Sequence, residues 1–244
     1  MGRDQRLNQY FNDEPERLAV TARMFNEGAP GYDVAERLTA LGSGSWYRRD
    51  VLRRNGVGPG MTVLDVAAGT GLVTQEAVRL VGDSGAVIAL DPSPGMLTEL
   101  RKKVSVQTIE AFAESIPLED KRVDFVSMGY ALRHVSDLDR AFGEYLRVLK
   151  PGGKVCVMEI SRPEGRFARL GLKFHIGVVV PLMALLMGKR QQVSRLWAYY
   201  SDTIEAAVDP AKVQEAMKRA GFVDVRCEVT MGIFREYIGR RPEQ

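Results

Sequence analysis

The chain has 244 residues, of which 45% are hydrophobic and 27% charged, so it can bury the core of an ordinary globular protein. Its net charge of +3 is too small to indicate a nucleic-acid-binding protein. The two cysteines, Cys156 and Cys227, lie in apolar runs without the spacing of a metal site, which predicts core thiols in a reducing compartment. The N-terminus has no apolar run typical of a signal peptide, so a cytoplasmic location is expected.

Four segments are predicted along the chain. They are an N-terminal helical cap (1–55), a core of alternating strands and helices (56–163), an apolar helical lid insertion (164–206), and a last helix with two strands that complete the core sheet (207–244). Within them, strands are predicted at 61–66, 86–91, 105–110, 123–128, 154–160, 223–229 and 231–239, and helices at 71–81, 94–103, 138–149 and 210–220. This alternation predicts an α/β fold with a mostly parallel seven-stranded sheet and helices on both faces.

The first core strand leads into a glycine turn. Gly69 and Gly71 follow an apolar strand directly, and a helix-prone run begins near Thr74. Glycine lets the backbone approach a ligand closely, and a helix N-terminus offers free N–H groups, so this pattern predicts a nucleotide-type site. Thr74 occupies the third glycine position of the dinucleotide pattern G-x-G-x-x-G, which disfavours an NAD-linked oxidoreductase.

Two acids complete this pattern. Asp65 stands just before the turn and suits a ligand that carries an amino group. Asp91 ends the next apolar run, where a carboxylate can accept hydrogen bonds from both ribose hydroxyls. Acid, glycine turn and second-strand acid together resemble the class I S-adenosylmethionine (SAM) methyltransferases.

The insertion contains a run of ten apolar residues, Val178–Met187. Ten residues fall short of the roughly 20 that a helix needs to cross a bilayer. Three interpretations remain open: a lid over an apolar substrate, a patch that contacts a membrane surface, and ordinary core.

Six stretches form a more specific pattern: YD (32–33), LDVAAGTG (64–71), AESIP (113–117), LRHVSD (132–137), RVLKPGG (147–153) and MEISRP (158–163). Together they resemble the UbiE/MenG family, the C-methyltransferases of ubiquinone and menaquinone biosynthesis, from about Phe25 to Gly239. The LRHVSD stretch, where the family has L-R-N-V-T-D, and the EISRP stretch, where it has E-F-S-K-P, are the specific ones. The resemblance implies a Rossmann-like class I methyltransferase fold and SAM as the cofactor.

Carried over position by position, the resemblance also implies a set of cofactor contacts. Phe112 departs from the family's usual Asn or Asp and cannot accept a hydrogen bond from the adenine amine, so backbone groups are expected to recognise the adenine. Gly129 stands where the family often has Ser. The implied cofactor-binding residues are Asp65, Ala67, Gly69, Gly71, Asp91, Met96, Phe112, Ala113 and Gly129.

Arg133 and His134 are the candidate catalytic residues. Methylation of a hydroquinone carbon requires help with a hydroxyl proton whose pKa is near 10. Arg133, which matches the family's proposed catalytic arginine, could stabilise the developing phenolate, and His134, in place of the family's Asn, could accept the proton. The alternatives are that Arg133 only pairs with Asp137 or Asp139 and that His134 caps a strand end.

The acceptor is expected to be an apolar small molecule, most simply a prenylated quinol or a similar aromatic. Its predicted contacts are Tyr32, Tyr130, Trp197 and Tyr199. Met231–Tyr237 departs from the Gly-Gly run ending in Leu-His that quinone enzymes usually have at this place.

Other functions remain open from the sequence. One is N- or O-methylation of a phospholipid or secondary metabolite, for which Glu159, Asp202 and Glu205 could tolerate a cationic amine. Another is a SAM-binding regulator without turnover. Peripheral membrane contact through the insertion and a homodimer are also left open.

Overall fold

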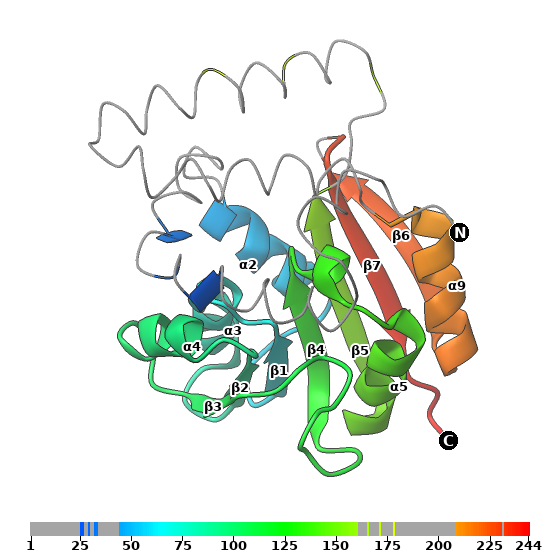
Figure 1. Cartoon of the computed structure of the whole chain (residues 1–244). Helices are drawn as coiled ribbons and strands as arrows, with labels where there is room; N and C mark the ends of the chain where they lie inside the picture. The colour runs from blue at the N-terminus through cyan, green and yellow to red at the C-terminus, as the bar shows by residue number, and fades with distance from the viewer. Residues whose placement is uncertain are drawn as a thin grey trace.

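A seven-stranded sheet runs through the computed structural model, which describes residues 25, 26, 29, 32, 33, 44–160, 165, 171, 178, 208–230 and 232–244 (Figure 1). The strand order is β3-β2-β1-β4-β5-β7-β6. The strands are β1 (Thr62–Val66), β2 (Ala86–Leu90), β3 (Gln107–Ile109), β4 (Val123–Gly129), β5 (Leu149–Ile160), β6 (Val223–Thr230) and β7 (Phe234–Arg240).

The sheet is parallel from β3 to β5, and β7 runs antiparallel between β5 and β6. From β1 the chain first builds outward through β2 and β3, and then returns to place β4 on the other side of β1. The carboxyl ends of β1 and β4 therefore flank a topological switch point, which is where open α/β sheets bind ligands. The predicted mostly parallel α/β sheet is confirmed.

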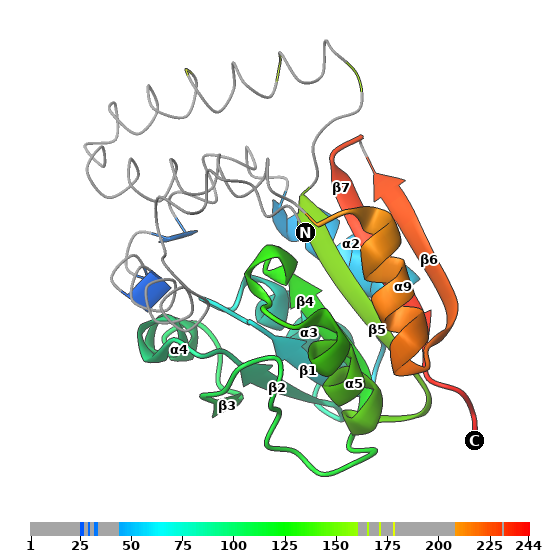
Figure 2. The ribbon, with the colours of Figure 1, turned by 45° about the vertical axis from the view of Figure 1, so that its right-hand side comes forward.

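Helices cover both faces of the sheet. Helices α5 (Leu138–Val148) and α9 (Pro210–Ala220) pack together on one face, and α2 (Gly44–Arg54) and α3 (Leu72–Val81) pack together on the other (Figure 2). Helix α4 (Pro94–Arg101) lies beside the outer strands, and a short 3₁₀ turn, η2 (Leu132–His134), follows β4.

Local capping explains where the helices begin. The Ser93 hydroxyl accepts a hydrogen bond from the Met96 amide, 3.2 Å away, at the start of α4, and Pro94 occupies the first helical position. Asp137 caps α5 through the Arg140 amide at 3.0 Å, and Asp209 caps α9. These caps give the physical reason why the predicted helix starts at residues 94, 138 and 210 are confirmed.

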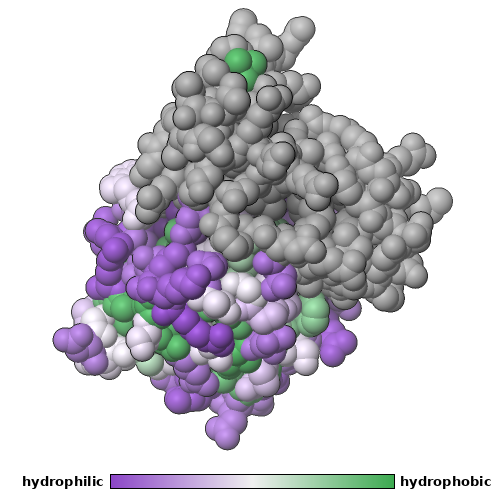
Figure 3. Space-filling model, turned by 60° about the vertical axis from the view of Figure 1, so that its left-hand side comes forward, coloured by the Kyte–Doolittle hydropathy of each residue, from purple (hydrophilic) through white to green (hydrophobic). Residues whose placement is uncertain are grey.

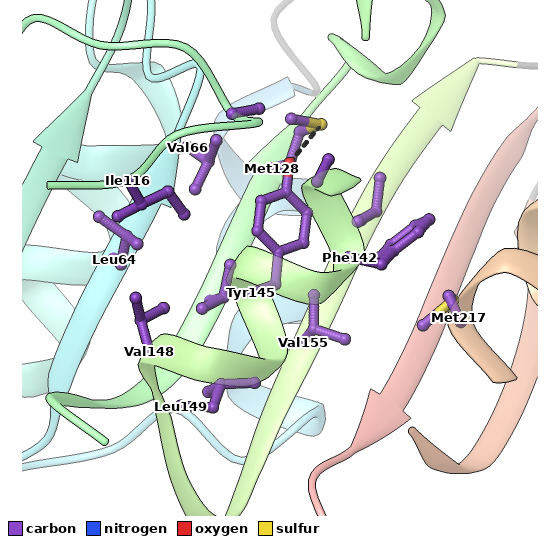
Figure 4. Close-up of a cluster of buried hydrophobic side chains, with 14 of the residues drawn as sticks. Leu64, Val66, Ile116, Met128, Phe142, Tyr145, Val148, Leu149, Val155 and Met217 are labelled. Atoms are coloured by element: carbon purple, nitrogen blue, oxygen red, sulfur yellow. Dashed lines mark hydrogen bonds between the residues drawn. The ribbon is translucent and has the colours of Figure 1, made fainter. Parts of the chain in front are cut away.

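The core has one layer on each side of the sheet. Figure 4 shows the layer under α5, where Tyr145 is fully buried and its hydroxyl lies 3.9 Å from the sulfur of Met128. Neighbouring positions of β1 separate the layers, because Leu64 faces α5 and Val63 faces α2 and α3. Burial of each large apolar side chain contributes about 1.5–3 kcal/mol, so both faces hold the sheet rigid beneath the site.

Several details differ from the predictions. Strand β3 spans only Gln107–Ile109, within the predicted 105–110, and β7 begins at Phe234 and not at residue 231. Strand β5 begins at Leu149, five residues early, because a register shift lets both Leu149 and Lys154 pair with β4 on either side of a bulge. Cys156 is buried as predicted, and burial raises the pKa of its thiol, but Cys227 is only partly buried because it lies on the edge strand β6.

Several predictions lie outside the described residues, among them Trp197, Tyr199 and most of the insertion at 164–206. The four-segment division also stays a prediction, although β6 and β7 do belong to the same sheet as β1–β5. Of the helices in the described ranges, none is long and apolar enough to cross a membrane. Seen from the left-hand side of Figure 1, the described surface is mostly hydrophilic, with hydrophobic residues in small separate areas (Figure 3).

Candidate active site

A cleft opens at the carboxyl ends of β1, β2 and β4. Its volume is about 840 Å³, a figure that includes the open space at its mouth. It lies at the switch point of the sheet, where the fold predicts a ligand. The residues around it are Phe25, Tyr32, Ala67, Gly69, Asp91, Pro92, Ser93, Met96, Phe112, Ala113, Glu114, Met128, Gly129, Tyr130, Ala131, His134 and Val135.

The glycine turn forms the floor of the cleft between β1 and α3. Gly71 has φ +85°, and a Cβ there would lie 2.8 Å from Cγ of Leu100, so both conformation and space require glycine. Gly69 has φ +56° and lines the cleft, and a Cβ on it would meet nothing within 4 Å. Open space therefore adjoins the backbone at the point where a ligand would approach.

Asp91 joins the second strand to this turn. Its Oδ2 accepts a hydrogen bond from the Gly69 amide at 2.8 Å, and its Oδ1 accepts one from the Ser93 amide at 2.8 Å. Burial raises the pKa of Asp91 to about 6, and the two amide bonds partly oppose this shift. Each carboxylate oxygen can accept a further hydrogen bond, so Asp91 presents acceptors to the cleft.

Asp65 lies beneath the turn and does not line the cleft. It is fully buried and accepts hydrogen bonds from the hydroxyls of Thr74 at 2.6 Å and Ser127 at 2.9 Å. Burial raises the pKa of Asp65 to about 6 against the effect of these bonds. Thr74, which interrupts the dinucleotide pattern, is therefore a partner of Asp65 that ties α3 to β1. The described contacts of Asp65 thus support the turn from beneath, and its contact with the cofactor stays a prediction.

The outer side of the cleft is mainly apolar. Met96 of α4 is buried there, and Ala113 and Phe112 follow β3, with Phe112 43% exposed at the edge. Gly129 ends β4, and a Cβ on it would lie 2.7 Å from Cγ2 of Val73. The serine that the family often has at position 129 would need Val73 to move, which explains the glycine.

The N-terminal residues contact both the turn and α4. The Thr70 hydroxyl donates a hydrogen bond to Asp33 at 2.6 Å, and Lys103 forms an ion pair with the same carboxylate. The Gly95 amide donates to Asn26 at 2.7 Å. These contacts place Phe25 and Tyr32 on the cleft wall.

The inner wall is aromatic around the end of β4. Tyr130 has φ +61°, which is strained for a residue with a side chain, and its amide donates to the Met158 carbonyl at 2.7 Å. The Arg48 guanidinium lies over the Tyr130 ring, 5.4 Å from its centroid. His134 also lines the cleft, and the Phe25 ring meets its ring edge-on at 5.2 Å.

Arg133 is placed differently from His134. It is 7% exposed, does not line the cleft, and donates through Nη1 to Glu159 at 2.6 Å. The alternative partners expected from the sequence are wrong, because Asp137 caps α5 and Asp139 pairs with Arg219.

Comparison with known proteins defines the family. The model of the ubiE/COQ5 methyltransferase family matches residues 13–241. The chain belongs to this family. It is 33% identical over 224 residues to the ubiquinone/menaquinone biosynthesis C-methyltransferase UbiE of Shewanella halifaxensis, with 88% of each chain covered. UbiE of Hahella chejuensis is 32% identical over 213 residues, with 84% of each chain covered.

A solved structure agrees on the fold. A SAM-dependent methyltransferase from Aquifex aeolicus superposes with a TM-score of 0.61 at 21% identity, covering 84% of this chain and 97% of that one. The Rossmann-like class I methyltransferase fold is thus confirmed. As a member of the ubiE/COQ5 family, the chain is a SAM-dependent methyltransferase.

The cleft of this ubiE/COQ5 member fits SAM. Gly69 leaves open space beside the backbone, Asp91 offers carboxylate oxygens for hydroxyl groups, and Met96 with Ala113 offers an apolar surface for a flat ring. Gly71 and Asp65 support this cradle from outside the cleft lining.

Sequence reasoning missed several cleft residues. Ser93 could have been found from its helix-cap position before Pro94, and Glu114 from the AESIP stretch. The apolar ones carry no chemical signal, because their place depends on how the chain folds over the cleft. These are Phe25, Pro92, Met128, Ala131 and Val135.

Proposed function

We propose that this chain transfers the methyl group of SAM to a ring carbon of a prenylated quinol or a similar apolar aromatic. The observation that carries the proposal is the composition of the cleft, where Tyr32, Tyr130 and Val135 line the wall together with a single imidazole, that of His134, among the cleft residues described. Aromatic and apolar side chains suit a flat ring, and an imidazole suits a hydroxyl proton. The names of the relatives agree with this acceptor class.

For the cofactor, we propose that Asp91 holds the ribose and that Met96, Phe112 and Ala113 flank the adenine. Phe112 offers only its ring, so the polar edge of the adenine is left to backbone groups. When bound, SAM would supply a methyl group on a positively charged sulfur. The ring carbon would take this methyl group as the S–CH3 bond breaks with its electron pair on sulfur, and it would then release its proton to water.

For the acceptor, we propose that His134 takes the hydroxyl proton, which makes the ring carbon electron-rich enough to react. Arg133 acts on the reaction indirectly, through its neighbour His134, because Glu159 holds the Arg133 guanidinium away from the cleft lining. This role differs from direct contact with the phenolate, which would require Arg133 to leave Glu159.

The test is methyl transfer itself. The protein is incubated with methyl-labelled SAM and reduced demethylmenaquinone or demethoxy-ubiquinol analogues, and products are analysed by mass spectrometry. We expect the label on a ring carbon. His134→Asn keeps a polar side chain without a base, so it should remove the acidic limb of the pH–rate profile. SAM binding without transfer to any quinol would contradict the proposal.

N-methylation of an amine is the second candidate, favoured by the carboxylate of Glu114 in the cleft lining. That carboxylate already accepts hydrogen bonds from the Ser136 amide and hydroxyl, each at 2.8 Å. Of the acids expected to serve an amine, Glu159 is engaged by Arg133, and Asp202 and Glu205 lie outside the described residues. Label on an amine nitrogen in the same assay would select this candidate.

A further inference from the structure

We propose that Glu159 is a positioning residue for the reaction, fixing the short turn that carries His134 into the cleft. The inference rests on the proposed function, because it assigns the support of the same proton acceptor. Glu159 lies at the end of β5, is 4% exposed, and does not line the cleft. It therefore acts through Arg133 and not on the acceptor.

The Glu159 carboxylate holds Arg133 at two points. Oε1 accepts a hydrogen bond from Nη1 of Arg133 at 2.6 Å, and Oε2 accepts one from the Arg133 backbone amide at 3.3 Å. Oε1 also accepts from the Ile160 amide at 2.9 Å, which fixes the carboxylate itself. The backbone and the side chain of the residue just before His134 are thus attached to the same buried group.

The turn that carries His134 is too short to fix its own orientation. Turn η2 has three residues, and the His134 amide donates to the Ala131 carbonyl at 2.9 Å and the Val135 amide to the Leu132 carbonyl at 3.1 Å. Tyr130, which comes just before Ala131, donates its amide hydrogen bond to the Met158 carbonyl of the same strand β5. Strand β5 therefore anchors both the start of the loop, through Met158, and its centre, through Glu159.

Charge gives Glu159 a second effect on His134. Arg133 adjoins His134 in the chain. The other titratable groups around the same cleft are Asp91, Glu114, Tyr32 and Tyr130. Replacing Glu159 with glutamine removes one negative charge from beside Arg133 while it keeps the shape. Protonated His134 is then less favourable, so the acidic limb of the pH–rate profile should move to lower pH.

The chain contains a matched control. Glu236 on β7 is also fully buried and also pairs with an arginine, Arg54, while Tyr47 donates to it at 2.7 Å. It does not line the cleft. Glu236→Gln therefore removes a buried carboxylate that pairs with an arginine, here a partly exposed one, and that has no hydrogen bond to the η2 turn. It reports the general cost of losing such a carboxylate.

The experiment compares Glu159→Gln, Glu159→Asp and Glu236→Gln in the full chain with SAM bound. We expect Glu159→Gln to keep the SAM dissociation constant within about twofold and to lose about ten- to a hundredfold in kcat with the quinol analogue, since small displacements of reacting groups cost this much. In Glu159→Gln the acidic limb of the pH–rate profile should move to lower pH. The double variant Arg133→Gln/Glu159→Gln should move the limb back to its position in the unmodified protein. Glu236→Gln should change the thermal midpoint and leave kcat and the limb unaltered.

A readout independent of turnover separates the two proposals. The chain has two histidines, His134 and His175, so the imidazole signals in a heteronuclear NMR spectrum can be assigned with His175→Gln. Glu159→Gln should shift the His134 signal and lower its titration midpoint, while the His175 signal serves as reference. If the unmodified protein methylates no quinol, the proposed function is wrong, but the NMR comparison still tests whether Glu159 positions His134. An unchanged His134 signal, or an equal loss of SAM binding and kcat, would overturn the positioning role.

Discussion

The amide of Gly69 donates a hydrogen bond to Oδ2 of Asp91 over 2.8 Å, so the glycine turn after β1 and the acid after β2 form one unit. The second oxygen of the same carboxylate is fixed by the Ser93 amide at the start of α4. Both oxygens are therefore oriented before any ligand binds, and less ordering is left to be done on binding.

Asp91→Asn should weaken SAM binding by at least about tenfold. An asparagine has one carbonyl oxygen, so its NH₂ group must face either the Gly69 or the Ser93 amide, and a lost buried acceptor costs about 1–3 kcal/mol. Isothermal titration calorimetry measures the change. Asp120→Asn is the control, since Asp120 is exposed and pairs with Arg147 before β4, at the far end of the sheet. Equal affinities in the two variants would contradict the assignment.

SAM affinity should fall as the pH drops below about 6. Burial raises the pKa of Asp91 to about 6, so the carboxylate that accepts hydroxyl hydrogen bonds is lost through protonation in this range. Calorimetric titrations between about pH 5 and pH 8 would show the dissociation constant rising toward the acidic end. A flat profile in the unmodified protein would show that the bound ligand does not depend on this carboxylate.

Asp65→Asn should flatten the pH dependence of stability. The pKa of Asp65 is raised from 3.8 to about 6 in the folded chain, so its stabilising contribution is fully present below the unfolded value and is lost as pH rises through about 6. A pKa difference of this size corresponds to roughly 3 kcal/mol. Relative to the unmodified protein, the variant's free energy of unfolding should therefore improve by that amount between about pH 4 and pH 7, measured by urea denaturation. Parallel pH profiles for the two proteins would contradict it.

Features that depend on residues close in sequence were predictable, and contacts between residues far apart in sequence were not. The glycine turn depends on residues close in sequence, and patterns of that length identified the turn and the order of the strands and helices. The partner of Arg133 was not predictable, because Glu159 is 26 residues away and comes near only through the pairing of β4 with β5. The interruption at Thr74 likewise gained its meaning only when the fold placed its hydroxyl on Asp65.

Gly71→Ala should destabilise the chain more than Gly60→Ala. Both glycines have positive φ, +85° and +80°, so each alanine carries a conformational cost of about 1–2 kcal/mol. Only at Gly71 would the new Cβ also lie 2.8 Å from Leu100, whereas at Gly60 its nearest neighbour would be the Ser84 hydroxyl at 3.7 Å, an ordinary contact. Overpacking adds about 1–3 kcal/mol. Chemical denaturation gives the difference, and SAM affinity should fall only for Gly71→Ala. Equal losses of stability would show that Leu100 moves aside freely.

Tyr130 combines a strained backbone with a wall of the cleft, and three substitutions separate the two features. Tyr130→Phe keeps the ring that faces the Arg48 guanidinium, so the KM for the quinol analogue should stay near that of the unmodified protein. Tyr130→Ala loses the ring and keeps the φ of +61°, so KM should rise several-fold while the SAM dissociation constant is unchanged. Tyr130→Gly should raise KM to the same extent but be more stable than Tyr130→Ala by about 1–2 kcal/mol, because glycine adopts this φ without strain. Steady-state kinetics and thermal denaturation of the three variants provide both comparisons. An unaltered KM in Tyr130→Ala would show that the Tyr130 ring does not contact the acceptor. Equal stability of the alanine and glycine variants would show that the backbone relaxes at this position.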